Sequence, residues 1–123
     1  IIPELIIPAE LIDELIVGEV QPLPIARPLT IPELITAAAW RYGVDPGYMV
    51  RLAHCESGLR PWAVSPWGDR GLFQWQAASW REAAPKAGIT ADWSAAFDPQ
   101  SASLVTAAAI ARGERWRWPW CGR

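Results

Sequence analysis

The sequence predicts a small α+β domain that is mostly helical and is preceded by a proline-rich arm. Two dipeptides, Asp45-Pro46 and Asp98-Pro99, place a capping carboxylate directly before a first-turn proline. A third helix start lies at residues 30–33, where Thr-Ile-Pro-Glu has the form of a capping box. Residues 59–76 are rich in glycine, proline and short apolar pieces, which indicates an irregular loop or a short hairpin.

Residues 1–29 are expected to form the arm, and residues 30–123 the domain. The first 26 residues carry five acidic side chains and no Lys or Arg. Prolines interrupt the apolar stretches, so no run of about 18 apolar residues is present to span a membrane. The missing basic start argues against a signal peptide. Because the chain begins at Ile1, we expect a processed product or a piece of a longer protein.

The arm is expected to hold one short helix at residues 10–17 and an extended linker at residues 21–28. Two roles fit its composition. One is to dock a partner protein or a larger assembly and so anchor the chain. The other is to pack as a strap against its own domain.

Four helices are expected in the domain. The first covers residues 30–43 and turns its alanines to the core, where Trp40 is also expected. The second follows a two-residue turn and covers residues 46–57, with a glycine after it as the stop. A short third helix covers residues 77–84 and ends before a proline. The fourth extends from the second Asp-Pro pair over residues 99–113.

The second expected helix ends in a carboxyl group. Met49, Leu52 and Ala53 have the spacing of a buried stripe, and Glu56 continues that stripe. Desolvation disfavours a charged carboxylate, so the pKa of Glu56 should be raised, as a general acid near neutral pH requires. However, a Glu in the last turn of a helix is more often solvated surface. Periodicity alone favours that second interpretation.

Four short motifs follow one another around this glutamate. In order, they are Glu56-Ser57, Pro-x-Ala-x-Ser at 61–65, Gly-x-x-Gly-Leu-x-Gln at 68–74, and Ser79-Trp80. Together with Gly-Val-Asp-Pro at 43–46, they resemble the lytic transglycosylase domain of the lysozyme superfamily. The resemblance covers roughly residues 31–123. It implies a lysozyme-like helical fold that cleaves the β-1,4 bond between N-acetylmuramic acid and N-acetylglucosamine in peptidoglycan.

The resemblance also implies residue roles. Glu56 would act as the acid and then as the base, while the sugar's own 6-hydroxyl attacks and leaves a 1,6-anhydro end. Ser65 stands where the family has a serine that hydrogen-bonds the catalytic carboxyl group, although an ordinary turn also fits it. Gln74 stands at the family's substrate-contacting glutamine. Gly71 would let the backbone approach the sugar closely.

Asp69 bears on the mechanism. Its position is usually uncharged in transglycosylases, whereas the string at residues 67–71 is similar to one in goose-type lysozymes, which hydrolyse the bond. With Asp69 positioning a water, the protein would be a hydrolysing muramidase of the same fold. The other interpretation is a loop carboxylate that pairs with Arg70 or caps a turn. A wall-binding or virion structural component without turnover is a further alternative, disfavoured by the presence of Glu56, Ser65 and Gln74.

Nine tryptophans occur in 123 residues. Tryptophan stacks on sugar rings, but it also fills small cores. Trp62, Trp67 and Trp75 lie in the loop after the motif glutamate and are candidate sugar contacts, and Trp80 is a candidate for the border of the cleft. By the resemblance, the alternating tryptophans of residues 116–120 pack the C-terminal end beneath a disulfide.

The chain contains two cysteines, Cys55 and Cys121, and one histidine, His54. These make no four-ligand zinc set, so we expect no metal and no other cofactor, and we assign His54 no catalytic role. The two cysteines by themselves are also compatible with unrelated buried thiols. Cys55 before the glutamate and the closing run at 116–121 resemble the resuscitation-promoting factors and related actinobacterial wall lysins, which bridge the two cysteines. A bridge implies an oxidising compartment: secreted, at the cell wall, or on a phage particle.

The formal net charge of −2 hides a split. Residues 27–123 carry eleven basic and eight acidic side chains, which leaves this part at +3. A mildly basic domain suits attraction to an anionic cell wall. No Lys/Arg run and no aromatic RNA motif is present, so nucleic-acid binding is not expected. The expected partner is the glycan strand of peptidoglycan.

Overall fold

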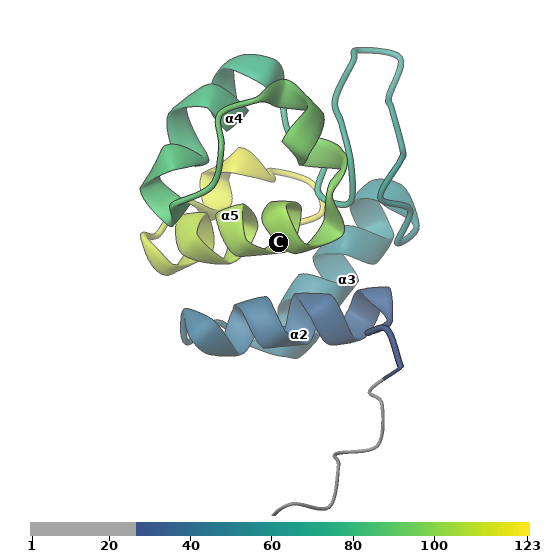
Figure 1. Cartoon of the computed structure of the whole chain (residues 1–123), viewed down its shortest axis with the longest axis vertical. Helices are drawn as coiled ribbons and strands as arrows, with labels where there is room; N and C mark the ends of the chain where they lie inside the picture. Colours follow the sequence, from purple (N-terminus) through teal and green to yellow (C-terminus); the bar gives the residue numbers. More distant parts are fainter. Residues whose placement is uncertain (1–26) are drawn as a thin grey trace, which may run out of the picture.

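The computed structural model describes residues 27–123 (Figure 1). The helix expected at 10–17 and most of the expected linker lie outside the described residues. The described part is mostly helical, as predicted. Its α-helices are α2 (Ile31–Arg41), α3 (Pro46–Ser57), α4 (Ala77–Ala83) and α5 (Pro99–Ala111). Three short 3₁₀ turns accompany them: η1 (Pro85–Ala87), η2 (Trp93–Phe97) and η3 (Arg115–Arg117).

Side-chain caps begin three of the helices at the predicted positions. The Thr30 hydroxyl accepts from the Glu33 N–H at 3.3 Å, and the Glu33 carboxylate accepts from the Thr30 N–H at 2.9 Å, which completes the capping box. Asp45 accepts from the Gly47 N–H at 3.2 Å at the start of α3. Asp98 accepts from the Ser101 N–H at 2.9 Å at the start of α5. These local contacts therefore fix where the helices begin.

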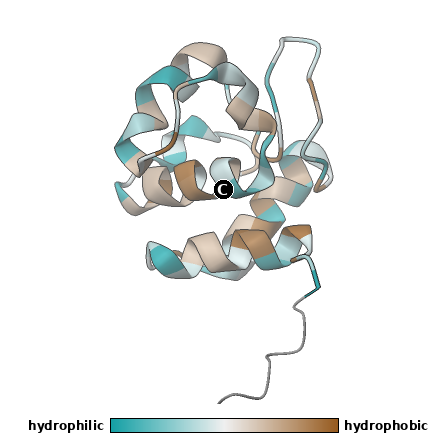
Figure 2. Cartoon of the chain, viewed as in Figure 1, coloured by the Kyte–Doolittle hydropathy of each residue, from teal (hydrophilic) through white to brown (hydrophobic). Residues whose placement is uncertain are grey.

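The core is built around α5. Most of this helix is buried, and its alanines allow the neighbouring elements to approach closely. Figure 1 shows α5 in the middle of the molecule, with α4 on one side and α2 on the other. In the hydropathy colouring of Figure 2, brown segments lie on α2, α3 and α5, the three helices that enclose much of the core. α3 packs against this core, where its Met49 and Leu52 are fully buried.

One expectation about the helices is wrong. Trp40 is 72% exposed, because α2 buries Ile35, Ala38 and Ala39, and a helix turns about 100° per residue, which carries Trp40 away from that face. The expectation that the third helix ends before Pro85 is confirmed. α4 ends at Ala83, and Pro85 opens the η1 turn, where its fixed φ is compatible with a helical first position.

Residues 59–76 form the irregular loop that was predicted, the tall loop beside α4 in Figure 1. Two isolated β-bridges brace it, pairing Arg70 with both Val64 and Trp75. The Arg70 guanidinium stacks over Trp93 at 4.7 Å and Phe97 at 4.8 Å, and it donates to the Trp93 carbonyl at 3.3 Å. The base of the loop is thus fastened to η2. Among residues 27–123, no helix has the length and apolar character needed to cross a membrane.

Candidate active site

A pocket of about 380 Å³ lies at the C-terminal end of α3. Three segments supply its walls: the last turn of α3, the stretch from the loop into α4, and the C-terminal segment after α5. The lining residues are Glu56, Asp69, Gln74, Trp75, Gln76, Ser79, Trp116, Arg117, Trp118, Pro119 and Trp120. The pocket therefore brings together four of the candidates, namely Glu56, Asp69, Gln74 and Trp75. It leaves out Ser65, Gly71, Trp62, Trp67 and Trp80.

Glu56 is half-buried at the end of the buried stripe of α3. Burial raises the pKa of its carboxyl group, and the negative charge of Asp69 raises the same pKa further. Within residues 27–123, the side chain of Glu56 takes part in no hydrogen bond and no ion pair, so its carboxyl group is available to a ligand in the pocket.

Asp69 lines the same pocket, and it is not paired with Arg70. The Arg70 guanidinium is engaged by Trp93 and Phe97 instead. No salt bridge to the Asp69 carboxylate occurs in the described part of the chain. The sequence-based expectation of an Asp69–Arg70 pair is therefore wrong, and the pocket contains two carboxylates that interact electrostatically.

The Ser65 side chain hydrogen-bonds within the loop, and it makes no hydrogen bond to Glu56 in the described residues. Its Oγ accepts from the backbone N–H of Asp69 at 3.0 Å and from that of Trp67 at 3.2 Å. A further bond runs from the Ser65 N–H to the Asp69 carbonyl at 3.0 Å. The ordinary-turn interpretation of Ser65 thus describes these contacts, which hold the backbone of Asp69 in place.

Gln74 lines the pocket from a strained backbone position, with φ at 53°. Its Nε2 donates to the carbonyl of Gly71 at 3.0 Å and to that of Ala63 at 3.2 Å. Two carbonyl acceptors require the NH₂ end of the amide, so the orientation of the side chain is settled by its neighbours. The Oε1 atom remains as a hydrogen-bond acceptor for a ligand.

Gly71 does not approach the pocket as expected. It is buried, its φ is 82°, and a Cβ at this position would collide with the carbonyl oxygen of Ala96 in η2. The close approach that its missing side chain permits is therefore to the protein's own backbone.

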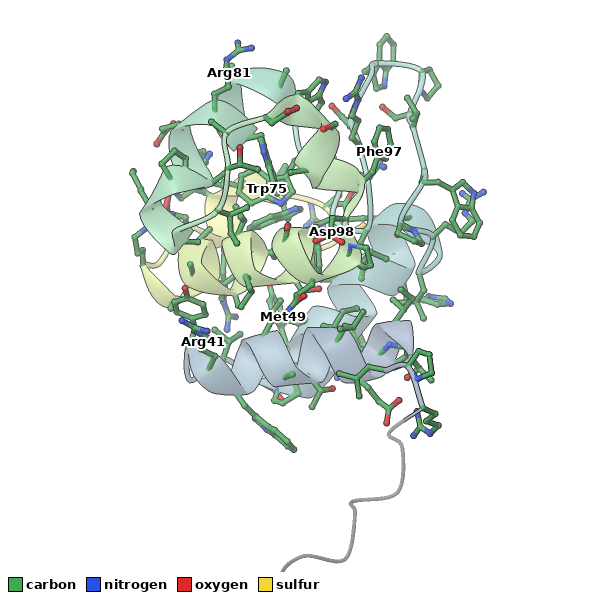
Figure 3. All side chains as sticks on the ribbon, viewed as in Figure 1. Arg41, Met49, Trp75, Arg81, Phe97 and Asp98 are labelled. Atoms are coloured by element: carbon green, nitrogen blue, oxygen red, sulfur yellow. A yellow bond between two sulfur atoms is a disulfide. The ribbon has the colours of Figure 1, made fainter. Side chains whose placement is uncertain are left out.

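The four candidate tryptophans divide in a way that the sequence did not predict. Trp80 is fully buried and donates to the Asp92 carbonyl at 3.1 Å, so it is a core residue and not the border of a cleft. Trp75 is also buried, donates to the Thr106 hydroxyl at 2.9 Å, and reaches the pocket only in part. Figure 3 shows Trp75 between the ribbons of α4 and α5. Trp62 and Trp67 are exposed and lie outside the pocket lining.

The C-terminal segment forms a pocket wall that sequence reasoning missed. Of its three tryptophans, only Trp118 packs inward, where its Nε1 donates to the Phe73 carbonyl at 2.9 Å. Trp116 and Trp120 are exposed and face the pocket, so the expectation that all three pack beneath the disulfide is wrong for these two. One signal in the sequence could have indicated this wall. Trp120 precedes Cys121, and Cys55 precedes Glu56.

A disulfide joins Cys55 to Cys121, with 5.7 Å between their Cα atoms, and so has the pairing that the resemblance implied. The Tyr48 hydroxyl adds a buried hydrogen bond to the Gly122 carbonyl at 2.8 Å. Both contacts fasten the C-terminal segment to α3. Among the described residues, His, Cys, Asp and Glu side chains form no group of three or more that could hold a metal ion.

The model of the Transglycosylase SLT domain family matches residues 33–113 of this chain. The chain belongs to this family. Membership supports, at family level, a lytic transglycosylase-like activity on peptidoglycan, and the helical architecture is consistent with a lysozyme-like fold. Neither the curated proteins nor the solved structures give a match. The matched part of the SLT domain includes Glu56, Asp69 and Gln74, whereas the tryptophan-rich wall at 116–120 lies beyond it.

Proposed function

We propose that this SLT domain cleaves the β-1,4 bond between N-acetylmuramic acid and N-acetylglucosamine in peptidoglycan, with Glu56 as the general acid and base. The position of Glu56 carries the proposal. Its carboxyl group is half-buried, lines a pocket, and has a raised pKa. A raised pKa keeps a larger fraction of the carboxyl group protonated near neutral pH, as proton donation requires.

The proposed reaction uses one carboxyl group twice. Glu56 donates its proton to the glycosidic oxygen as the bond from that oxygen to C1 of the muramic acid breaks. The resulting carboxylate then accepts the proton of the sugar's 6-hydroxyl as this oxygen attacks C1. The products are a 1,6-anhydro end and a free 4-hydroxyl, and Glu56 is protonated again. Gln74 is proposed to accept a hydrogen bond from the substrate through Oε1.

Hydrolysis on the same fold is the second candidate function. The observation that favours it is the Asp69 carboxylate, which lines the Glu56 pocket and acts electrostatically on Glu56. An unpaired carboxylate can accept a hydrogen bond from a water and orient it toward C1. Water would then replace the 6-hydroxyl as the nucleophile, and the product would carry a reducing end.

The proposed site of action is the bacterial cell wall, reached by secretion or on a phage particle. An oxidising compartment keeps the Cys55–Cys121 bond formed, and it is also where peptidoglycan is exposed. A docking role for the N-terminal arm stays a prediction, because residues 1–26 lie outside the described part.

The Glu56→Gln variant tests the identity of the acid. Gln keeps the size of the side chain but has no acidic proton to transfer, so clearing of a cell-wall suspension should fall by about 100-fold or more. Sedimentation of the variant with insoluble peptidoglycan should persist, because the rest of the pocket is intact. Clearing at the wild-type rate would mean that another residue is the acid.

The products distinguish the two mechanisms. Transglycosylation yields 1,6-anhydro muropeptides, which are lighter by one water than the reducing ends left by hydrolysis. We expect mass spectrometry of a digest to show anhydro products, and we expect the Asp69→Asn variant to give the same products. A digest that contains only reducing ends, lost on Asp69→Asn, would establish the muramidase instead.

A further inference from the structure

Two tryptophans of the C-terminal segment are exposed where exposure is costly. Trp116 is 67% exposed and Trp120 is 76% exposed, although both line the pocket that contains Glu56. An indole in water forgoes the free energy that burial of its large apolar faces would release. A ligand with flat apolar surfaces would recover part of it. The pyranose rings of a glycan present such surfaces through their C–H groups, with hydroxyl groups around the edge.

A cationic side chain stacks on each of the two rings. The Arg117 guanidinium lies 4.6 Å from the centre of the Trp116 ring and is itself nearly buried, in an ion pair with Glu114 at 2.7 Å. Arg123 lies 5.0 Å from the centre of the Trp120 ring. Rings that are already positioned lose little conformational freedom when a ligand binds, which favours affinity.

The disulfide brings this wall close to the catalytic candidate. The Cα atoms of Cys55 and Cys121 are 5.7 Å apart. Glu56 directly follows Cys55, and Trp120 directly precedes Cys121. With about 3.8 Å per Cα step, the Cα atoms of Glu56 and Trp120 lie within about 13 Å of each other. A single short oligosaccharide can therefore contact both.

We propose that Trp116 and Trp120 form an aromatic platform for β-1,4-linked N-acetylhexosamine rings on one side of the cleavage point. This inference rests on the proposed function and deepens it, because it assigns the recognition of the glycan to a segment outside the part that matches the SLT family model. The platform recognises the sugar rings and needs no peptide stem. A glycan is favoured over a protein partner because Glu56, Asp69 and Gln74 place polar acceptors for hydroxyl groups in the same pocket.

The test is direct binding of chitohexaose, a β-1,4 N-acetylglucosamine hexamer without peptide, by isothermal titration calorimetry. All proteins carry Glu56→Gln, so that no turnover occurs. Trp116→Ala and Trp120→Ala should each weaken binding by about tenfold, and the double variant should weaken it more. The matched control is Trp40→Ala, which should bind normally, because Trp40 is 72% exposed and lines a separate pocket on α2. Thermal melting should show all these variants folded, because the rings removed are exposed.

Unchanged binding by both platform variants would overturn the proposal, as would no binding of chitohexaose by the Glu56→Gln protein or equal weakening by Trp40→Ala. This outcome is distinguishable from a failure of the proposed function. Wall clearing by the unsubstituted protein, together with unchanged binding by the platform variants, would remove the platform and leave the function. Weakened binding by the platform variants, without any wall clearing by the unsubstituted protein, would support the platform and contradict the proposed function.

Discussion

In the pocket, the negative charge of Asp69 acts on the carboxyl group of Glu56. Burial is the larger cause of the raised pKa of Glu56, and the charge of Asp69 is the smaller one. This order matters because the two causes are removed by different changes. A substitution at Asp69 removes the charge and leaves the burial of Glu56 in place.

The Asp69→Asn variant should therefore lower the pKa of Glu56 without returning it to the ordinary value. Activity needs protonated Glu56, so the high-pH limb of the profile of kcat/KM should move to lower pH. Asp69→Glu, which keeps the negative charge, should move this limb less. The measurement is wall clearing across a pH series. A limb that stays in place in Asp69→Asn would show that Glu56 does not set it.

At the residue scale, the sequence predicted the half-buried position of Glu56 better than the exposure of the tryptophans. The stripe of Met49, Leu52 and Ala53 alone favoured a solvated Glu56, and the family motifs around Glu56 were needed to single it out. The position of a tryptophan in the sequence does not predict its exposure, because its large ring packs well both in a core and against a sugar. Trp80 and Trp75 became core residues through contacts with segments that no local pattern specifies. Trp40 was predictable, since helical periodicity alone places it off the buried face of α2.

The helices were the most predictable elements. A cap joins a side chain to a backbone N–H two or three residues away, so the starts at Thr30, Asp45 and Asp98 are written in local sequence. The loop at 59–76 was predictable as a loop but not in its detail. Gly71 packs against Ala96, which is 25 residues later in the chain, and no pattern in the loop sequence predicts this contact.

Gly71→Ala and Gly68→Ala should separate the two roles of loop glycines. Both residues have positive φ, which costs an alanine about 1–2 kcal/mol. Only at Gly71 would the new Cβ also collide with the Ala96 carbonyl oxygen, whereas Gly68 has open space around it. We expect Gly71→Ala to cost about 3 kcal/mol or more in the free energy of unfolding. Urea unfolding measures both, and equal midpoints would contradict the assigned contact.

At the scale of the whole molecule, the pocket depends on packing between distant segments. The family pattern singled out Glu56 and Gln74, and the similarity to goose-type lysozymes singled out Asp69; all three come from one continuous stretch. The wall at residues 116–120 could not be read in the same way, because it reaches the pocket only through the folded path of α5 and the bond between Cys121 and Cys55. Long-range contacts of this kind leave no periodic trace in a sequence.

The global stability of the domain should report the raised pKa of Glu56. Its pKa is raised in the folded state, so the folded state is favoured while Glu56 is protonated. This contribution is fully present below about pH 4, the ordinary range of a Glu, and is lost as pH rises through the raised pKa. Glu56→Gln should therefore melt at a higher temperature than the unsubstituted protein at pH 7, and the difference should vanish near pH 4. A lower melting temperature for the variant at pH 7 would contradict the burial of Glu56.

The Cys55–Cys121 bond also changes the effect of a break in the backbone. The two cysteines stand on opposite sides of the tall loop, so a single break in the backbone at its exposed tip, near Trp67 and Gly68, would leave both pieces covalently joined. Glu56 would then belong to one piece and Asp69 to the other. The disulfide thus closes residues 55–121 into a covalent ring. One cut in the loop opens this ring without separating Glu56 from Asp69.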